Sequence, residues 1–431
     1  MNIKPFGASN RFFYYCCSGE VCTFDLRVSI ALTNTLNHEI LIKSAEKALK
    51  IFPEFAVRPV IYKNSVCFIE NNNEIPLRPD NSNYYFGTDE TNGYPFCFMY
   101  RENGFMFSCF HGQSDYWGIL RFVNAVLYYY AVELGYEVKD VIKDFVRDEN
   151  SMDEQNKYFP YENFANPKQI PFWSFKNNGA FKIPEKTFAP DADYARMFNI
   201  RCDKNALLNF SKGLSTSLIP LLNIIISSSI LNLYELEDLP IISMVPVNLR
   251  ALYNTKSMSN FSDGILLNYD KKISSYDIER QALILRAKMD LQMQNENFDL
   301  TLAGKIKAVE NFMASGKNIE DLSHEITDIS KPDGFNFMTY ACTYPGQLEF
   351  DNPIIKYASI LICVRQSVPF GTFMAAYKDD FNITLSQGFD SDNLANEILL
   401  KIRSLGISAS IQDMGHISCN KLCCEKLLKL N

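Results

Sequence analysis

The stretch FMFSCFHGQSDYWGILRFVNAVLYYY, residues 105–130, leads from an apolar strand into an amphipathic helix. Its histidine, His111, is one of only four in the chain, and Asp115 follows four residues later. Gly135 supplies a typical helix end. We expect His111 to end the strand and residues 112–117 to form the turn into the helix. The helix is predicted by apolar residues that recur with the spacing of one helix face: Ile119, Phe122, Val123, Val126, Leu127 and Tyr130.

On residue types alone, His111 has two interpretations. A histidine at the end of a strand is often a hydrogen-bonded structural residue, and Asp115 can simply cap the following helix. Alternatively, an imidazole with a pKa of about 6.5 is suited to take a proton from a substrate at neutral pH. Residue types do not decide between these two interpretations.

Strands and helices mix in both halves of the chain. Residues 22–32 predict a strand, and residues 37–55 keep helical spacing until Pro53. Two hairpins follow, residues 56–70 with a turn at Lys63-Asn64 and residues 95–110 with a turn at residues 102–104. Because no strict βαβ rhythm develops, we expect an α/β fold with mixed sheets.

Residues 146–190 are polar, contain proline and asparagine, and show no sustained period. Such composition indicates a connection between two halves. We therefore predict an N-terminal lobe over residues 1–150 and a connecting segment over residues 151–189. The C-terminal lobe, residues 190–431, would contain a closing helix over residues 391–407 and a cysteine-rich tail.

Residues 213–234 are long enough to span a membrane and carry no charge. They also contain five serines, one threonine, two asparagines and Pro220, which is a heavy polar load for a lipid-facing helix. We predict a buried helix that is capped near residues 215–217, with Pro220 early in it, and no membrane span.

Composition limits the classes of partner and compartment. The 431 residues carry a formal net charge of −8, which argues against nucleic acid as the main partner. Twelve cysteines are scattered over the chain, and the first residues lack a secretory signal, so we expect reduced thiols in a cytoplasmic protein.

The C-terminal tail GHISCNKLCCEKLLKL brings His416, Cys419, Cys423 and Cys424 close together in sequence. A metal site is one interpretation, but the spacing lacks the paired Cys-x-x-Cys of structural zinc sites. We expect a C-terminal helix that carries cysteines, and no metal.

The sequence FHGQSDYWG resembles the His-His-x-x-x-Asp-Gly signature of the CoA-dependent acyltransferase superfamily. That superfamily includes chloramphenicol acetyltransferase, the condensation domains of peptide synthetases and alcohol acetyltransferase-like proteins. His111 falls on the second, catalytic histidine and Asp115 on the aspartate. Phe110 replaces the first histidine and Tyr116 replaces the glycine, while Gly118 can keep the turn tight.

The resemblance extends over nearly the whole chain. Residues 41–60 look like the first helix of the family and its entry to the next strand, and residues 93–112 look like the hairpin before the motif. The stretch MVPVNLRALYNTKSMSNFSDG resembles a second-half segment of the alcohol acetyltransferase branch, with six positions in register: Pro246, Asn248, Leu249, Arg250, Asn260 and Phe261. The plant-branch Asp-Phe-Gly-Trp-Gly motif is absent, and CTYPG at residues 342–346 matches a related bacterial motif only loosely.

The resemblance implies a two-lobed, chloramphenicol acetyltransferase-like fold with a tunnel between the lobes. It implies acyl transfer from acyl-CoA, as co-substrate, to a small alcohol or amine, with His111 as general base and without a covalent acyl-enzyme. No permanently bound cofactor is expected. Asp115 should turn away from the cavity and pair with Arg27, Arg58 or Arg250. Gly118 and Arg250 are expected to have structural roles at the site, and four residues are expected along the substrate channel: Phe110, Ser114, Tyr116 and Asn260.

Two other functions stay open at this point. The acyl donor could be held on a carrier protein, as it is in condensation domains. Alternatively, Phe110 and Tyr116 could mark a degenerate member that binds a ligand or protein without catalysis.

Overall fold

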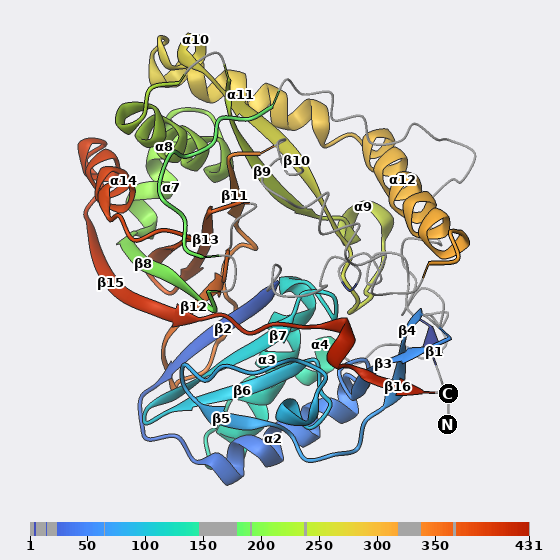
Figure 1. The fold of residues 1–431 in the computed structure, drawn as a ribbon. Coiled ribbons are helices and arrows are strands. Elements are labelled where there is room, and N and C mark those ends of the chain that lie inside the picture. Colours follow the sequence, from blue (N-terminus) through green and yellow to red (C-terminus); the bar gives the residue numbers. More distant parts are fainter. Residues whose placement is uncertain are drawn as a thin grey trace.

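The structure is a computed structural model that describes most of the chain. The described residues are 4–5, 14, 24–63, 65–145, 179–189, 192–236, 239–317, 338–364 and 368–430. Most of the predicted connecting segment, residues 151–178, lies outside them. The described chain forms two lobes, each with a mixed sheet as its centre (Figure 1).

The N-terminal lobe is built on a five-stranded sheet of order β12-β2-β7-β6-β5. Helices α2 (His38–Ile51) and α3 (Tyr116–Glu133) pack against each other and share one apolar core with this sheet. The predicted hairpin that leads to His111 is confirmed, because β6 and β7 pair as antiparallel neighbours. The strands are β2 (Asp25–Leu32), β5 (Leu77–Pro79), β6 (Phe96–Arg101), β7 (Gly104–Phe110) and β12 (Ile355–Ile362).

A smaller four-stranded sheet of order β1-β4-β3-β16 flanks the N-terminal lobe. Its central pair is the other predicted hairpin, and the two strands run antiparallel as expected. The short helices η1 (Asp89–Thr91) and α4 (Ile142–Phe145) complete this part of the chain. The strands of the sheet are β1 (Lys4–Pro5), β3 (Val57–Tyr62), β4 (Ser65–Glu70) and β16 (Leu428–Leu430).

The C-terminal lobe contains a seven-stranded sheet of order β10-β9-β11-β13-β14-β8-β15. Strands β9 and β10 form an antiparallel pair along the whole length of β10. Thus the sheet mixes parallel pairs, such as β11 with β9, with antiparallel ones. Its strands are β8 (Tyr194–Asp203), β9 (Ile241–Asn248), β10 (Ser262–Tyr269), β11 (Tyr340–Thr343), β13 (Phe370–Tyr377), β14 (Asp380–Gln387) and β15 (Ala409–Ser418).

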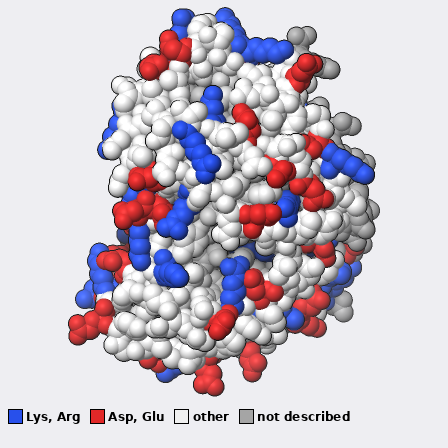
Figure 2. Space-filling model, turned by 90° about the vertical axis from the view of Figure 1, so that its left-hand side faces the viewer, with Lys and Arg blue, Asp and Glu red and all other residues white. Residues whose placement is uncertain are grey.

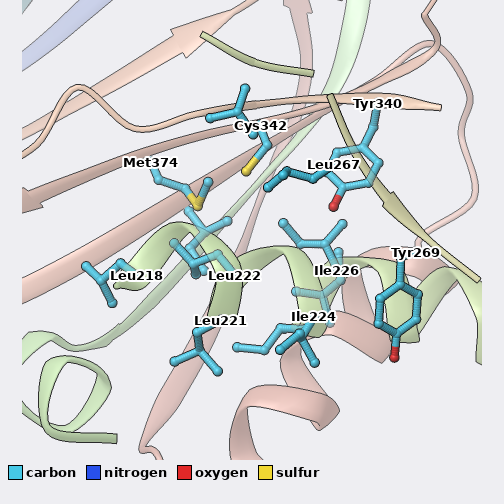
Figure 3. Packing of buried hydrophobic residues seen from close by; sticks show 14 of the residues in the cluster. Leu218, Leu221, Leu222, Ile224, Ile226, Leu267, Tyr269, Tyr340, Cys342 and Met374 are labelled. Atoms are coloured by element: carbon cyan, nitrogen blue, oxygen red, sulfur yellow. The ribbon is translucent and has the colours of Figure 1, made fainter. Parts of the chain in front are cut away.

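Helices cover one face of the seven-stranded sheet, and the central one is the uncharged helix predicted over residues 213–234 (Figure 1). Figure 3 shows its leucine and isoleucine side chains against β10, β11 and β13. Burial on nearly every side explains why the helix shows no polar stripe. The helices of this lobe are α7 (Lys204–Gly213), α8 (Leu218–Leu233), α9 (Arg250–Tyr253), α10 (Lys271–Ser274), α11 (Ile278–Gln292), α12 (Asn295–Ala314) and α14 (Asn393–Ser404).

Helix α8 begins after Ser217, as predicted, and Pro220 lies in its first turn. No single described helix has both the length and the apolar character needed to cross a membrane. Taken together, α7 and α8 pass such a test, but they meet at an angle of 97°.

Two segments of the second half lie in the N-terminal lobe. Strand β12 pairs with β2 at the edge of the five-stranded sheet, and β16 pairs with β3 in the smaller sheet. Strand β15 forms the edge of the seven-stranded sheet, and the chain after it runs across to β16 in the smaller sheet (Figure 1). The second half therefore contributes strands to the N-terminal lobe, which the predicted division at residue 190 does not capture.

The prediction of a C-terminal helix is wrong. Residues 409–418 form β15, residues 424–426 form the short helix η2 (Cys424–Lys426), and residues 428–430 form β16. The backbone of the tail finds its hydrogen-bond partners on the edges of two sheets, where Cys419, Leu422 and Cys424 also become buried. This tertiary pairing outweighs the local preference for a helix.

A fully buried ion pair fastens the tail to the N-terminal lobe. Arg27 Nη2 and Nε donate to Asp25 Oδ2 at 2.6 and 2.8 Å, and both side chains are 0% exposed. Arg27 Nη2 also donates to the carbonyl oxygen of Ser418 at 2.5 Å, and the backbone N–H of Asn420 donates to Asp25 Oδ2 at 3.2 Å. Ser108 Oγ donates to Asp25 Oδ1 at 2.6 Å. Charged groups thus bind the tail to β2 and β7.

Replacement of Arg27 by methionine should destabilise the protein strongly. The change leaves the Asp25 carboxylate buried without its cation, at a cost of about 3–5 kcal/mol. Chemical denaturation would measure the free energy of unfolding. The control is Arg101→Met, which breaks the partly exposed Arg101–Asp80 pair and should cost at most about 1 kcal/mol. Equal losses in the two variants would contradict a special role for the buried pair.

Candidate functional site

His111 follows the last residue of β7 and lies where the N-terminal lobe meets the loop before β10. Its backbone N–H donates to the carbonyl oxygen of Phe24 at 2.7 Å, which extends the pairing of β7 with β2 by one residue. The side chain is partly buried, and the ring of Phe24 lies edge-on to it with centroids 6.3 Å apart. The strand end therefore fixes the backbone of His111, as the sequence predicts.

The imidazole has two close polar neighbours at the same nitrogen. Nδ1 lies 3.2 Å from the carbonyl oxygen of Ser114 and 3.1 Å from Asn260 Nδ2. A carbonyl oxygen can only accept, so a bond to Ser114 requires a proton on Nδ1. In that tautomer the lone pair of the neutral ring is on Nε2, which is the form that a general base needs.

Burial lowers the pKa of His111 from its usual value of 6.5, because desolvation disfavours the imidazolium. The negative charge of Asp115 and the backbone carbonyl of Ser114 act in the opposite direction, while the positive charge of Lys305 lowers the pKa further. Lys305 belongs to α12 and is held by Asp263 Oδ1 at 3.0 Å. At neutral pH the ring is therefore neutral, as a base must be.

Asp115 joins the two lobes. Its Oδ1 accepts the backbone N–H of Gly118 at 3.2 Å and so caps α3, while its Oδ2 accepts Arg250 Nη1 at 2.8 Å. The same Oδ2 accepts the backbone N–H of Phe261 at 2.9 Å. The arginine left open by the sequence is thus Arg250, because Arg27 pairs with Asp25 and Arg58 with Asp89.

The loop of residues 248–261 is organised around Arg250. Its Nε donates to the carbonyl oxygen of Ser257 at 2.7 Å, and its Nη2 donates to that of Ser259 at 2.6 Å. Nη1 also reaches Asn248 Oδ1 at 3.0 Å. The guanidinium is 3% exposed, and every one of these contacts orients the loop that ends at Asn260. The ion pair with Asp115 therefore places Asn260 beside His111.

Ser114 and Gly118 allow a close approach between α3 and this loop. Ser114 Oγ donates to the carbonyl oxygen of Met258 at 2.6 Å, and Ser114 is fully buried. A Cβ on Gly118 would overlap Ser114 Oγ and come within 2.7 Å of the same carbonyl oxygen. A side chain at residue 118 would therefore not fit between α3 and the loop. Glycine at this position lets the two approach each other closely.

Phe110 and Tyr116 are both buried in apolar clusters. Phe110 is 0% exposed and meets the ring of Tyr14 edge-on, with centroids 4.7 Å apart. Tyr116, the first residue of α3, is 6% exposed, and its hydroxyl donates to the carbonyl oxygen of Leu361 in β12 at 2.7 Å. These contacts give both residues a packing role, and their place along a channel stays a prediction.

Two features of the site were not predicted from the sequence. The first is a cluster of polar side chains on α12 and β10. In it, Lys305 and Thr301 from α12 both bind the carboxylate of Asp263 from β10. The second is Trp117, whose ring lies 4.4 Å from the guanidinium carbon of Arg250 and 3.4 Å from that of Arg121. Neither α12 nor a contact between residues so far apart in sequence has a local signal.

Within the described residues, no group of three or more histidine, cysteine or acidic side chains is arranged to hold a metal ion. Tail residue His416 instead contacts Asp390, with Nε2 2.7 Å from Oδ1, while the tail cysteines are buried. On the face shown in Figure 2, basic and acidic side chains are interspersed.

Comparison with known proteins shows which solved structures share this fold. No protein-family model matches the chain, and no curated protein matches its sequence. Among solved structures, the trichothecene 15-O-acetyltransferase TRI3 from Fusarium sporotrichioides is similar, with 12% identity, a TM-score of 0.58, and 93% of this chain and 94% of that chain covered. TRI101 from Fusarium graminearum, complexed with coenzyme A and T-2 mycotoxin, has 10% identity and a TM-score of 0.59, with 95% and 100% covered.

The condensation domain of the monacolin K polyketide synthase MokA is also similar, with 10% identity, a TM-score of 0.59, and 94% of this chain and 97% of that chain covered. The prediction of a two-lobed fold with mixed sheets, of the kind found in CoA-dependent acyltransferases and condensation domains, is therefore confirmed. Identities this low show the shared fold alone.

Replacement of Gly118 by alanine should disturb the contact between the lobes. The added methyl group must displace Ser114 or the backbone at Met258, and overpacking of this kind costs about 1–3 kcal/mol. Thermal unfolding and denaturant titration would measure the loss. Gly213→Ala is a matched control, because Gly213 also lies in the terminal turn of a helix but has no neighbour within 4 Å of an added Cβ. A Gly118→Ala variant as stable as this control would contradict the close approach.

Proposed function

We propose that the protein transfers an acyl group from acyl-CoA to a small alcohol or amine, with His111 as general base. The observation that carries this proposal is the hydrogen bond between His111 Nδ1 and the carbonyl oxygen of Ser114, because it favours the tautomer with its lone pair on Nε2. The fold shared with acetyltransferases supports the same reaction class.

In the proposed reaction, His111 Nε2 takes the proton of the acceptor hydroxyl or amine as its oxygen or nitrogen attacks the thioester carbonyl carbon. The C–S bond then breaks, and the imidazolium returns the proton to the sulfur of CoA. No bond forms between the acyl group and the protein, and no permanently bound cofactor is needed. Ser114 and Asn260 contact the ring at Nδ1, so we propose that they orient the imidazole from the edge of the substrate channel, with Nε2 facing the substrate.

A carrier protein as the holder of the acyl donor is a second candidate. The similarity to the MokA condensation domain over most of both chains favours it. A thioester on a phosphopantetheine arm presents the same reacting atoms as acyl-CoA, so His111 would have the same role. Comparing turnover of acyl-CoA with turnover of the same acyl group on a carrier protein would separate the two donors.

A binding protein without catalysis is the third candidate, and CoA binding without thioester turnover would favour it. We further propose a cytoplasmic location. This is supported by buried thiols that form no disulfide: Cys97, Cys109, Cys202, Cys342, Cys423 and Cys424.

Replacement of His111 by alanine should lower the rate of acyl transfer by about 10²- to 10⁴-fold, the usual contribution of a general base. Thiol release from several acyl-CoAs, with a panel of alcohols and amines, would measure it. The control is His38→Ala, because His38 is exposed at the start of α2. Circular dichroism should show that both variants keep the fold. Near wild-type turnover of His111→Ala would refute the assignment of the base.

The value of kcat/KM should rise with pH through a midpoint below 6.5 and then stay level. The reason is that burial and Lys305 lower the pKa of His111, so the neutral base persists to lower pH. Lys305→Met should move the midpoint upward, because it removes a positive charge and leaves the Asp263 carboxylate without that partner. Lys307→Met, on the exposed side of the same helix, is the control and should leave the midpoint unchanged. An unchanged midpoint in the Lys305→Met variant would contradict this electrostatic account.

A further inference from the structure

The Nδ1 atom of His111 lies between a hydrogen-bond acceptor and a hydrogen-bond donor. The acceptor is the carbonyl oxygen of Ser114, 3.2 Å away, and the donor is Asn260 Nδ2, 3.1 Å away. The first comes from the N-terminal lobe and the second from the loop of the C-terminal lobe. Each neighbour therefore requires a different protonation state of the same atom.

The orientation of the Asn260 amide follows from its other contacts. Its Nδ2 lies 3.1 Å from the backbone carbonyl oxygen of His111, which can only accept. Its Oδ1 accepts the hydroxyl of Ser262 at 3.0 Å. A rotated amide would place Oδ1 against the carbonyl oxygen of His111, two acceptors in contact. The atom that faces Nδ1 is therefore the NH₂ group, a donor.

A neutral imidazole cannot satisfy both neighbours at once. With the proton on Nδ1, the ring donates to Ser114, and Nε2 carries the lone pair that a general base needs. With the proton on Nε2, Nδ1 accepts from Asn260, and Nε2 cannot take a proton from a substrate. The two contacts are of similar length, so neither geometry excludes the other.

We propose that Asn260 is a positioning residue that holds a share of His111 in the tautomer with its proton on Nε2, and so sets the fraction of enzyme that is ready to act as a base. The effect on turnover rests on the function proposed above, whereas the effect on the ring does not. Asn260 also disfavours the protonated imidazolium, because the Nδ1–H of that form faces the N–H of the Asn260 amide.

The position of Asn260 depends on the contact between the lobes. Arg250 holds the carbonyl oxygens of Ser257 and Ser259 within the same loop, and Asp115 holds Arg250 and the N–H of Phe261. A shift of this loop relative to α3 therefore moves the amide away from Nδ1. In this way the docking of the lobes controls the protonation pattern of the catalytic ring.

Nuclear magnetic resonance of the ¹⁵N-labelled histidines tests the proposal without any substrate. The chain has only four histidines, and a His111→Gln variant assigns the resonances of His111. The ¹⁵N shifts report which ring nitrogen carries the proton, and a pH titration reports the pKa. For the wild type we expect a Nδ1 resonance that is shifted toward the unprotonated position.

Asn260→Ala should move the Nδ1 resonance toward the protonated position and raise the pKa of His111, because the competing donor is gone. Ser262→Ala, which only loosens the amide, should produce a smaller change in the same direction. Asn268→Ala is the matched control, because Asn268 is an exposed asparagine on β10, the strand that follows Asn260. Its His111 resonances should equal those of the wild type.

Wild-type Nδ1 that is fully protonated at neutral pH would overturn the proposal without any variant. So would unchanged His111 shifts and pKa in a folded Asn260→Ala protein. A third outcome is that the resonances shift as expected but the protein turns over no acyl-CoA or carrier-bound thioester. That result would overturn the proposed catalytic function and leave the role of Asn260 intact. With an active enzyme, the pH midpoint of kcat/KM should move upward in Asn260→Ala together with the pKa measured by resonance.

Discussion

The buried ion pair between Asp115 and Arg250 is the contact on which the geometry of the site depends. Removing two charges from water is costly, and a single bond of 2.8 Å does not offset that cost. Here both groups have several further partners: Asp115 accepts two backbone N–H groups, and Arg250 donates to two backbone carbonyl oxygens. The pair therefore specifies one arrangement of α3 against the loop, and the close fit at Gly118 is possible only in that arrangement.

The strands that the second half contributes to the N-terminal lobe explain how the two lobes remain in fixed register around His111. Strand β12 extends the N-terminal sheet, yet it also packs on β13 and β14 of the other lobe. The tail follows β8 and then enters the N-terminal lobe, where Arg27 and Asp25 bind its backbone. Backbone pairing is directional, so these crossings leave little freedom for the lobes to slide. His111 on one lobe can therefore keep Asn260 of the other lobe as a fixed neighbour.

The sequence predicts best where one element carries its own signal. The hairpin before His111 has a marked turn, the helix after it has a regular apolar period, and the uncharged helix α8 has a recognisable start; all three are present. The tail fails because its structure is decided by sheet edges that lie far away in sequence. The sequence leaves the partner of Asp115 open among three arginines for the same reason, since only the fold brings residues 115 and 250 together. Asn260 was placed in the channel, but its two contacts with His111 have no signal in its neighbours.

Phe110 and Tyr116, where the sequence departs from the acyltransferase signature that it resembles, both have packing roles in the structure. Successive residues of a strand point to opposite faces, so Phe110 points into the apolar cluster around Tyr14 while His111 faces the site. A histidine in that cluster would need a hydrogen-bond partner, which phenylalanine does not. Tyr116 fills the core beneath α3 and ties the helix to β12 through its hydroxyl. Both side chains therefore act on the scaffold that holds His111, and a substitution in a signature is informative only when the direction of the side chain is known.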